Sequence, residues 1–238
     1  MSKLHIVTPV KDSVEIAEKT IESIMSSEIS ADFIYTVYND FSSDESTNAL
    51  EQLSKKFDFN LINLKDVTLH PSPNYLTILQ MAQQRASFEE AHILIVESDV
   101  VVGKNTIQQL YDYATQLENP GLIASITTDV NKKVNYPYLF AKRIKSKVAS
   151  TRKQLSFCCT LISQSFLNSY NFNQLNPDRT WHDYFISHKT LELGYKNYLV
   201  TSVPVVHLQH SIYPWMHLKQ TQPGRYYWNK IIDKIFNK

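Results

Sequence analysis

The sequence predicts an α/β domain with a mainly parallel central sheet flanked by helices. Apolar, β-branched segments alternate three times with segments whose apolar residues recur at helical spacing, before a fourth apolar segment begins near residue 93. That fourth segment, residues 93–102 (ILIVESDVVV), is continuously apolar apart from Glu-Ser-Asp at its centre. Continuous apolarity is typical of a strand buried on both faces, as in a parallel sheet covered by helices.

The first half of the chain gives the clearest elements. Residues 4–10 are expected to form a first strand, which Pro9 ends because proline cannot donate a hydrogen bond inside a sheet. The turn at residues 39–46 is rich in Asn, Asp and Ser, the residues that cap helix N-termini. The other elements follow the same two patterns, with strands expected at 33–38, 61–64, 93–102 and 121–126 and helices at 14–26, 46–57, 75–88 and 104–116.

The second half is less regular. Residues 129–153 are polar and basic, so we expect either a solvated surface segment or one that closes over an anionic ligand. A helix that opens near Trp181 should end at Gly194, because glycine commonly follows the last helical residue. The other expected elements are a strand at 155–162, a short helix at 165–170, extended pieces at 198–200 and 203–208, and an amphipathic helix at 225–238.

Composition argues against several classes of protein. The net charge of +1 gives no general attraction to nucleic acid, and no apolar run approaches the ~20 residues of a membrane-spanning helix. None of the four glycines belongs to a G-x-G-x-x-G dinucleotide pattern or a G-x-x-x-x-G-K-[ST] phosphate loop. The two cysteines, Cys158 and Cys159, are adjacent and have no partner elsewhere, which indicates a reducing compartment. Since Met1 leads directly into a strand without a signal segment, we expect a cytoplasmic protein.

Acidic side chains follow predicted strands or open helices at three places, and a histidine follows at a fourth. Glu97 and Asp99 end the central strand, at the edge where open α/β sheets bind ligands. Because burying an unpaired carboxylate costs several kcal/mol, they should meet a cation, a partner or the solvent of an ordinary turn. From the residues alone, each of the other three has a structural explanation as well as a functional one. Asp40 can be a helix N-cap, Asp183 can be a charge that complements a helix dipole, and His207 can be a histidine packed at a strand end.

Five segments, in this order and on this alternating frame, resemble a family 2 glycosyltransferase with the GT-A fold. Residues 39–44 (NDFSSD) resemble the family's D-D-G-S-x-D turn, with Asn39 for the first Asp and Phe41 for Gly. Residues 97–99 (ESD) resemble its D-x-D metal motif. The other matches are the first strand and its proline at 7–12, the Trp-His-Asp at 181–183 with His182 for the family's Glu, and the V-x-H-x-x-x-S ending at 205–211.

The resemblance implies a role for each matched residue. A divalent cation, Mn²⁺ or Mg²⁺, would be held by Glu97, Asp99 and His207 against the diphosphate of a nucleotide-sugar donor, and an imidazole ligand suits Mn²⁺ better. Asp183 would be the general base that deprotonates the acceptor hydroxyl, and one base without a nucleophilic carboxylate implies inversion. The remaining assignments are Thr8, Pro9, Asp40 and Ser98 at the nucleotide, and Trp181 and His182 on the acceptor side.

The expected function is therefore transfer of a sugar from a UDP-, dTDP- or GDP-linked donor to a glycan or lipid-linked acceptor. The setting that the resemblance implies is bacterial surface polysaccharide or lipopolysaccharide synthesis. We expect a single domain over 1–238, in which 1–128 bind the nucleotide sugar and 129–224 supply the acceptor and catalytic half. The basic, aromatic helix at 225–238 would rest on the inner face of the cell membrane, pack on the domain, or form a dimer interface.

Three alternatives stay open. The departures at Asn39, Phe41, Glu97 and His182 are compatible with a nucleotide-sugar-binding protein that has lost catalysis. A sugar nucleotidyltransferase usually carries a Gly-rich basic loop after its first strand, and residues 8–12 contain no glycine. A non-catalytic adaptor would leave the acids of the central strand unexplained.

Overall fold

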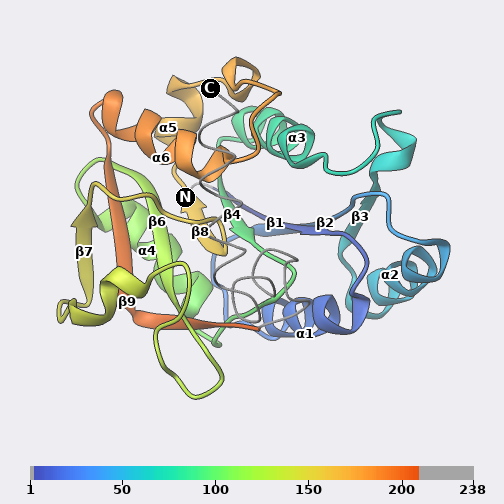
Figure 1. Cartoon of the computed structure of the whole chain (residues 1–238), viewed down its shortest axis with the longest axis horizontal. Helices are drawn as coiled ribbons and strands as arrows, with labels where there is room; N and C mark the ends of the chain where they lie inside the picture. Colours follow the sequence, from blue (N-terminus) through green and yellow to red (C-terminus); the bar gives the residue numbers. More distant parts are fainter. Residues whose placement is uncertain (1–2, 209–238) are drawn as a thin grey trace, which may run out of the picture. The chain divides into compact units, whose positions relative to one another are not determined.

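The computed structural model describes residues 3–208, which lie in one compact unit. Within these residues nine strands form one sheet, in the order β3-β2-β1-β4-β8-β6-β9-β5, with β7 paired to β9 (Figure 1). The strands are β1 Lys3–Val10, β2 Phe33–Asn39, β3 Asn60–Asn63, β4 Ala91–Val96, β5 Val100–Val101, β6 Pro120–Thr128, β7 Val148–Thr151, β8 Cys159–Ile162 and β9 Lys196–His207.

The sheet is parallel where the sequence alternates between strands and helices. β1 pairs in parallel with β2 and β4, and β2 with β3, so these four strands end at one edge. β8 then runs antiparallel between β4 and β6, and its first residues lie at the edge where β4 ends. β6 and β9 pair in parallel, while β5 and β7 run antiparallel to β9. The antiparallel β8 thus brings the start of a strand to the edge that carries the predicted acids.

Helices cover both faces of the sheet. α1, α2 and α4 pack in one hydrophobic cluster and α3, α5 and α6 in the other, and Figure 1 shows α3 and α1 on opposite sides of β1 and β2. The helices are α1 Val14–Met25, α2 Asp44–Phe57, α3 Tyr75–Phe88, α4 Thr106–Gln116, α5 Gln164–Ser169 and α6 His182–Glu192. Short 3₁₀ helices occupy Leu64–Asp66, Leu139–Arg143 and Phe172–Gln174.

β4 is buried on both faces, as its continuous apolarity predicts. Leu94 and Val96 belong to the cluster with α1, whereas Ile93 and Ile95 belong to the cluster with α3, and none of the four is more than 1% exposed. Burial of each such side chain contributes about 1.5–3 kcal/mol. The strand that delivers the acids is therefore held firmly from both sides.

The two best-marked helix ends agree with the sequence. Ser43 caps α2, since its hydroxyl accepts the Ser46 N–H at 3.2 Å. α6 ends just before Gly194, which has a φ of 82° and so occupies the left-handed region that glycine tolerates.

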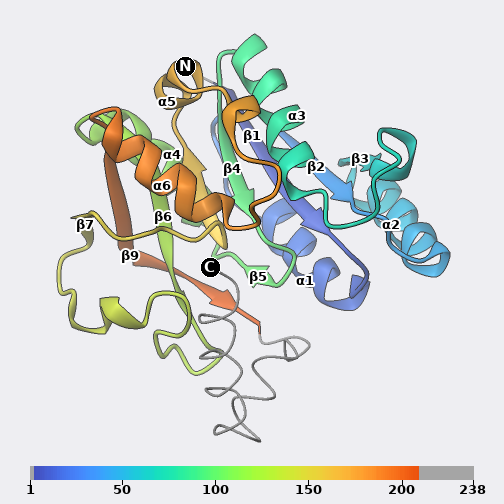
Figure 2. The same ribbon diagram turned by 45° about the horizontal axis from the view of Figure 1, so that its top comes forward.

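The predicted strand at 93–102 is in fact two strands. β4 stops at Val96, and the chain turns through Glu97–Asp99, where the Val100 N–H donates to the Glu97 carbonyl at 3.1 Å. The two residues of β5 then pair with β9 instead of continuing beside β1 (Figure 2). The sequence does not reveal this break because the residues on both sides of the turn are apolar.

The later elements also differ in extent from the prediction. The pieces expected at 198–200 and 203–208 join in one strand, β9, with an irregularity where Ser125 and Thr127 of β6 oppose Val200 and Val205. The segment 129–153 contains β7, which the sequence does not mark. The strand expected at 155–162 is shortened to β8, because the Leu155 N–H bonds to the Ser187 hydroxyl of α6 at 3.0 Å instead of to a strand.

The helix expected at 225–238 lies outside the described residues. No helix among residues 3–208 is long and apolar enough to cross a membrane.

Candidate active site

The turn after β4 is fixed by backbone hydrogen bonds to two other strands. The Glu97 N–H donates to the carbonyl of Cys158, just before β8, at 3.0 Å. The Leu208 N–H, just after β9, donates to the Asp99 carbonyl at 2.7 Å. The two acids therefore lie where the end of β4, the start of β8 and the end of β9 meet.

Asp99 and His207 form a close pair at this edge. Asp99 Oδ2 lies 3.1 Å from His207 Nε2, and the other ring nitrogen, Nδ1, lies 3.1 Å from the Tyr136 carbonyl. Burial disfavours the charged imidazole, but the hydrogen bond to Asp99 and its negative charge outweigh burial and raise the pKa of His207. The structure thus brings together two of the three predicted metal ligands.

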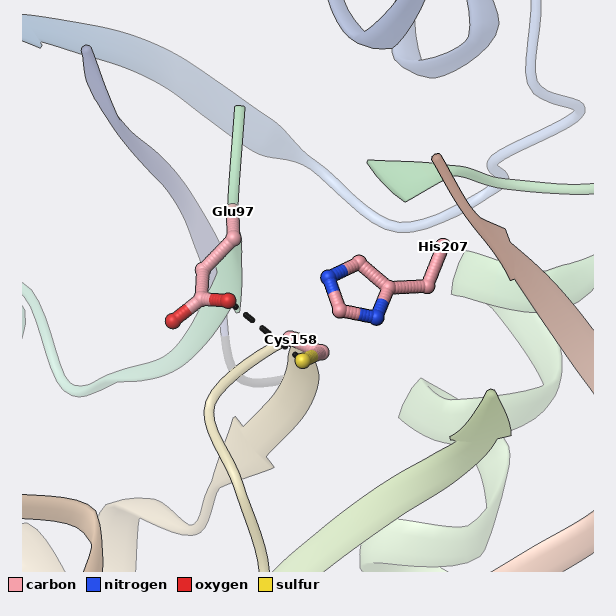
Figure 3. Close-up of side chains that lie close together, drawn as sticks. All are labelled: Glu97, Cys158 and His207. Atoms are coloured by element: carbon pink, nitrogen blue, oxygen red, sulfur yellow. Dashed lines mark hydrogen bonds between the residues drawn. The ribbon is translucent and has the colours of Figure 1, made fainter. Parts of the chain in front are cut away.

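Glu97, the third predicted ligand, contacts a cysteine that the sequence did not assign to the site. The Cys158 thiol donates to Glu97 Oε2 at 3.3 Å. Burial raises the pKa of Glu97 to about 7, and the charge of Asp99 acts in the same direction. Figure 3 shows Glu97, Cys158 and His207 close together, and one ligand atom from each lies within 4.8 Å of the others.

The chemistry of these side chains fits a divalent cation. Carboxylate oxygen, imidazole nitrogen and thiolate sulfur are all metal donors, and a bound cation would favour their deprotonated forms. Glu97, Asp99 and His207 would hold it, with charge supplied by the two acids. Coordination mainly by the oxygen donors would favour Mn²⁺ or Mg²⁺, whereas coordination by the thiolate would favour Zn²⁺.

Asp183 lies in an adjoining pocket of about 280 Å³ at the start of α6. Its Oδ2 accepts from Gln154 Nε2 at 2.8 Å and its Oδ1 from the Tyr184 N–H at 2.8 Å. Burial raises the pKa of Asp183 even though both hydrogen bonds favour the charged form. The pocket is lined by Tyr136, Pro137, Phe140, Lys153, Gln154, Ser156 and Asp183. An oriented carboxylate in a small pocket is suited to accept a proton.

His182 and Tyr75 form a stacked aromatic pair. Their ring centroids are 6.3 Å apart and their planes differ by 7°. His182 Nδ1 and the Tyr75 hydroxyl are both buried, and neither has a hydrogen-bond partner within the described part of the chain. Burial lowers the pKa of His182, which favours the neutral ring. Trp181, assigned with His182 to the acceptor side, is 71% exposed.

Asp40 is buried and its carboxylate is occupied by the chain itself. Oδ2 accepts from the Ser72 hydroxyl at 2.7 Å and from the Asn74 N–H at 2.9 Å, and Oδ1 accepts from Asn74 Nδ2 at 2.8 Å. These bonds fix the loop that leads into α3. The assignment of Asp40 to the nucleotide stays a prediction, and it requires this carboxylate to exchange or share its present donors.

The turn around Asp40 explains the two departures from the family's motif. The Asn39 amide is buried and donates to Thr47 Oγ1 at 2.9 Å and to Asn63 Oδ1 at 2.8 Å, so it joins β2 to α2 and β3. Phe41 has a φ of 58°, in the left-handed region where the motif's glycine is favoured. Phe41 thus adopts a backbone conformation that glycine, the residue of the family's motif, would adopt more easily.

The other residues assigned to the nucleotide lie on strand ends near the same edge. Thr8 is fully buried and its hydroxyl accepts from the Tyr35 hydroxyl at 3.0 Å, while Pro9 beside it is half-buried. The Ser98 carbonyl accepts from the Thr20 hydroxyl at 2.9 Å, which ties the acidic turn to α1. These contacts are structural, and the roles in binding stay predictions.

A larger cavity, about 800 Å³, lies away from these acids between α3 and the segment from α5 to residue 174. Amide, hydroxyl and apolar side chains line it, including Gln80, Gln84, Asn171 and Gln174. It contains none of the predicted catalytic residues. We therefore place the candidate site at the acidic edge on its chemistry and not on cavity size.

Sequence reasoning missed Tyr75, Tyr136, Gln154 and Cys158. No pattern around them indicates a site, because each reaches the edge through tertiary structure. Cys158 arrives there because β8 is antiparallel to β4, and Gln154 because residues 154–158 run beside α6. The reactivity of cysteine as a residue type is a signal that could have drawn attention to Cys158.

Solved structures show which class of fold this is. The mannosyltransferase PcManGT from Pyrobaculum calidifontis, in complex with GDP-Man and Mn²⁺, aligns with a TM-score of 0.67 and 13% identity, over 97% of this chain and 64% of that chain. S. aureus TarS 1-349 in complex with UDP-GlcNAc aligns with a TM-score of 0.67 and 13% identity, over 88% and 59%. GalNAc-T7 with UDP, GalNAc and Mn²⁺ aligns with a TM-score of 0.64 and 10% identity, over 88% and 44%.

The protein has the fold of the GT-A glycosyltransferases, as the resemblance implied, and it spans less than two thirds of each of these chains. The family model for Glycosyl transferase family 2 matches residues 5–171, and the chain therefore belongs to this family. No curated protein matches it. The matched range includes Asp40, Glu97 and Asp99 but ends before Asp183 and His207, which are assigned on the motif resemblance and the geometry above.

Proposed function

We propose that the protein is an inverting glycosyltransferase that moves a sugar from a nucleoside-diphosphate sugar to an acceptor hydroxyl. The observation that carries this proposal is the meeting of two carboxylate sites at one edge of the sheet. Glu97 and Asp99 lie with His207, and Asp183 lies in the adjoining pocket. Tyr136 joins the two sites, since its carbonyl contacts His207 and the residue lines the pocket of Asp183.

The two sites would divide the chemistry between them. Bound at Glu97, Asp99 and His207, a Mn²⁺ or Mg²⁺ ion would stabilise the negative charge that grows on the departing diphosphate. Asp183 would accept the proton of the attacking hydroxyl, with Gln154 orienting its carboxylate. No second carboxylate is placed in the described pocket to act as a nucleophile, so a single displacement with inversion is the reaction these residues support.

Family membership supports a nucleotide-sugar donor, and the ligands in the similar structures put UDP- and GDP-sugars first, with dTDP-sugars next. The motif resemblance alone supports a glycan or lipid-linked acceptor, a setting in bacterial surface polysaccharide or lipopolysaccharide synthesis, and peripheral membrane contact through residues 225–238. Thr8, Pro9, Asp40 and Ser98 would bind the nucleotide, and Trp181 and His182 the acceptor.

A thermal-shift panel tests the donor site. UDP, dTDP, GDP and CMP are each added with and without Mn²⁺, because a ligand that binds only the folded state stabilises it by about 2.7 kcal/mol at 100 times its Kd. We expect one nucleotide to raise the melting temperature only when Mn²⁺ is present. Asp99→Ala should abolish that metal-dependent shift, and Glu51→Gln, an exposed change on α2, should leave it intact.

A transfer assay then separates the enzyme from its alternatives. Sugar donors that carry the nucleotide selected by the panel are each followed by NMR, and we expect a product whose anomeric configuration is opposite to that of the donor. Nucleotide binding with no turnover of any donor would favour the degenerate binding protein, which the occupied carboxylate of Asp40 makes the second candidate. Formation of a sugar nucleotide from a sugar 1-phosphate would instead identify a nucleotidyltransferase.

A further inference from the structure

Glu97, Cys158 and His207 bring three different kinds of metal donor to one point. They come from the turn after β4, the residue before β8 and the end of β9 (Figure 3). Zinc bonds of about 2.0–2.3 Å place two donors of one tetrahedral ion about 3.3–3.6 Å apart. The Cys158 Sγ to Glu97 Oε2 distance is 3.3 Å, and the three ligand atoms are all within 4.8 Å of one another. Side-chain movements of up to about 1.5 Å would close the set around one ion.

The surroundings of His207 leave its Nε2 available to a second proton or to a metal ion. A carbonyl only accepts hydrogen bonds, so Nδ1, 3.1 Å from the Tyr136 carbonyl, carries the proton of the neutral ring. Nε2 then has a lone pair directed at the Asp99 carboxylate, 3.1 Å away. Two lone pairs at this distance repel unless a proton or a metal ion joins them. Fixing the tautomer through Nδ1 is also how proteins prepare a histidine for a metal.

We propose that Cys158 is a ligand, and that its thiolate makes this a zinc-preferring site with Glu97 and His207. Thiolate and imidazole select Zn²⁺, whereas Mg²⁺ and Mn²⁺ prefer oxygen donors. The thiol proton that now lies between Cys158 and Glu97 leaves to solvent when the metal binds. These three ligands leave one position on a tetrahedral zinc ion, and the Asp99 carboxylate, 3.1 Å from His207 Nε2, lies beside it.

Zinc at this site would inhibit the transferase, and this second statement rests on the proposed function. Glu97 and His207 serve both metals, so zinc and the Mn²⁺ that contacts the donor diphosphate compete for the same side chains. A tetrahedral zinc ion with at most one position free of protein ligands cannot reproduce the coordination that a six-coordinate ion offers to a diphosphate. Zinc should therefore oppose Mn²⁺ in the transfer assay.

Cobalt titration of the full chain tests the ligand without any nucleotide or sugar. Co²⁺ bound by a thiolate gives a charge-transfer absorption in the near ultraviolet, together with strong visible bands when it is four-coordinate. We expect both in the wild type, displaced by stoichiometric Zn²⁺, with release of a proton into weakly buffered solution. C158S should lose the charge-transfer band and bind Zn²⁺ at least tenfold more weakly.

Cys159 provides the matched control. It is the next residue, equally buried, and burial raises its pKa to about 12, but it is not part of the donor group. C159S should keep the charge-transfer band, and near-ultraviolet circular dichroism checks that both variants are folded. C158A repeats the measurement in case serine itself ligates the ion.

The outcomes distinguish failure of the zinc site at Cys158 from failure of the proposed glycosyltransferase function. A wild type without the band, or a C158S variant that keeps the band and its zinc affinity, would overturn the thiolate site. A cobalt band that depends on Cys158 supports it even in a protein that transfers no sugar. Loss of the Mn²⁺-dependent nucleotide shift with the band retained would count only against the proposed function.

Discussion

The carboxylate of Asp40 holds both amide groups of Asn74, the backbone N–H at 2.9 Å and the side-chain Nδ2 at 2.8 Å, across 34 residues of sequence. Both residues are buried, so these bonds are shielded from water. They tie the turn after β2 to the start of α3, and so connect the predicted nucleotide residue with the helix that carries Tyr75.

Asp40→Asn should lower the free energy of unfolding by about 1–3 kcal/mol, because an NH₂ group would face buried N–H and hydroxyl donors. Asn74→Ala, which removes one of the same bonds, should cost about 1 kcal/mol. Urea unfolding measures both. Unchanged stability in Asp40→Asn would show that the carboxylate is not a structural anchor, and loss of nucleotide binding in that stable variant would then support the nucleotide role alone.

Asp183→Asn should lower kcat by about 10²–10⁴-fold, the usual contribution of a general base, while the Kd for nucleotide and Mn²⁺ stays unchanged. Steady-state kinetics and calorimetry check the two halves of this expectation. Equal loss of nucleotide affinity would refute the assignment.

Gln154→Ala should move the acid limb of the rate profile to higher pH. The rate falls as pH drops because the base becomes protonated, and burial already raises the pKa of Asp183 above its ordinary value. The Gln154 hydrogen bond favours the carboxylate, so its removal raises that pKa further. A limb that moves to lower pH, or does not move, would contradict this role for Gln154.

His92 should make the stability of the protein fall in mild acid. Burial lowers the pKa of His92 from 6.5 to about 4 while its Nδ1 accepts the Gln164 N–H at 3.0 Å. Between these values the unfolded chain binds a proton that the folded chain does not, so stability is lost as pH falls from 6.5 to about 4. The loss attributable to this residue is at most about 3 kcal/mol.

His92→Asn keeps an acceptor for that N–H but cannot titrate. Its free energy of unfolding, measured in urea from pH 7 to pH 4, should fall by less than that of the wild type. His188→Asn, at an exposed histidine of α6, should follow the wild type. Parallel curves for wild type and His92→Asn would exclude His92 as the cause.

Two glycines should respond to alanine for different reasons. Gly194→Ala should cost about 1 kcal/mol, since the residue has a φ of 82° but has open space around it. Gly121→Ala should cost about 1–3 kcal/mol through overpacking, because a Cβ there would lie 2.8 Å from the Thr190 Cβ. Each kcal/mol corresponds to a fall of about 2–4 °C in Tm for a domain of this size. A larger loss at Gly194 than at Gly121 would reverse this ranking.

Much of the fold could be predicted because periodicity and burial are local properties of sequence. The apolar spacing of α1 and the unbroken apolarity of β4 correspond directly to the two hydrophobic clusters. β7 could not be predicted, since Val148–Thr151 lies in a basic segment and becomes a strand only by pairing with β9. The split between β4 and β5 was hidden for a similar reason, because the pairing partner of β5 is distant in sequence.

For the candidate site, motifs in the sequence mark the acids and His207, but they do not mark Cys158 or Gln154. Asp99 and His207 stand in recognisable motifs, and the structure places them 3.1 Å apart. Cys158 and Gln154 stand in none, and they reach the site through the antiparallel path of β8 and the packing of α6. Chain topology brings these two residues to the site, and patterns in a single sequence indicate topology only weakly.

Asp99 and His207 are 108 positions apart in the sequence, and this separation has a consequence for the biosynthesis of the chain. His207 emerges from the ribosome only with the end of β9, after the other strands of the sheet in residues 3–208 have been made. Bringing such distant positions together carries a large loop-closure entropy, so this corner should be among the last to become ordered. If the proposed metal site forms at this corner, it is complete only after these strands have been made, so metal uptake would report that their synthesis and folding have finished.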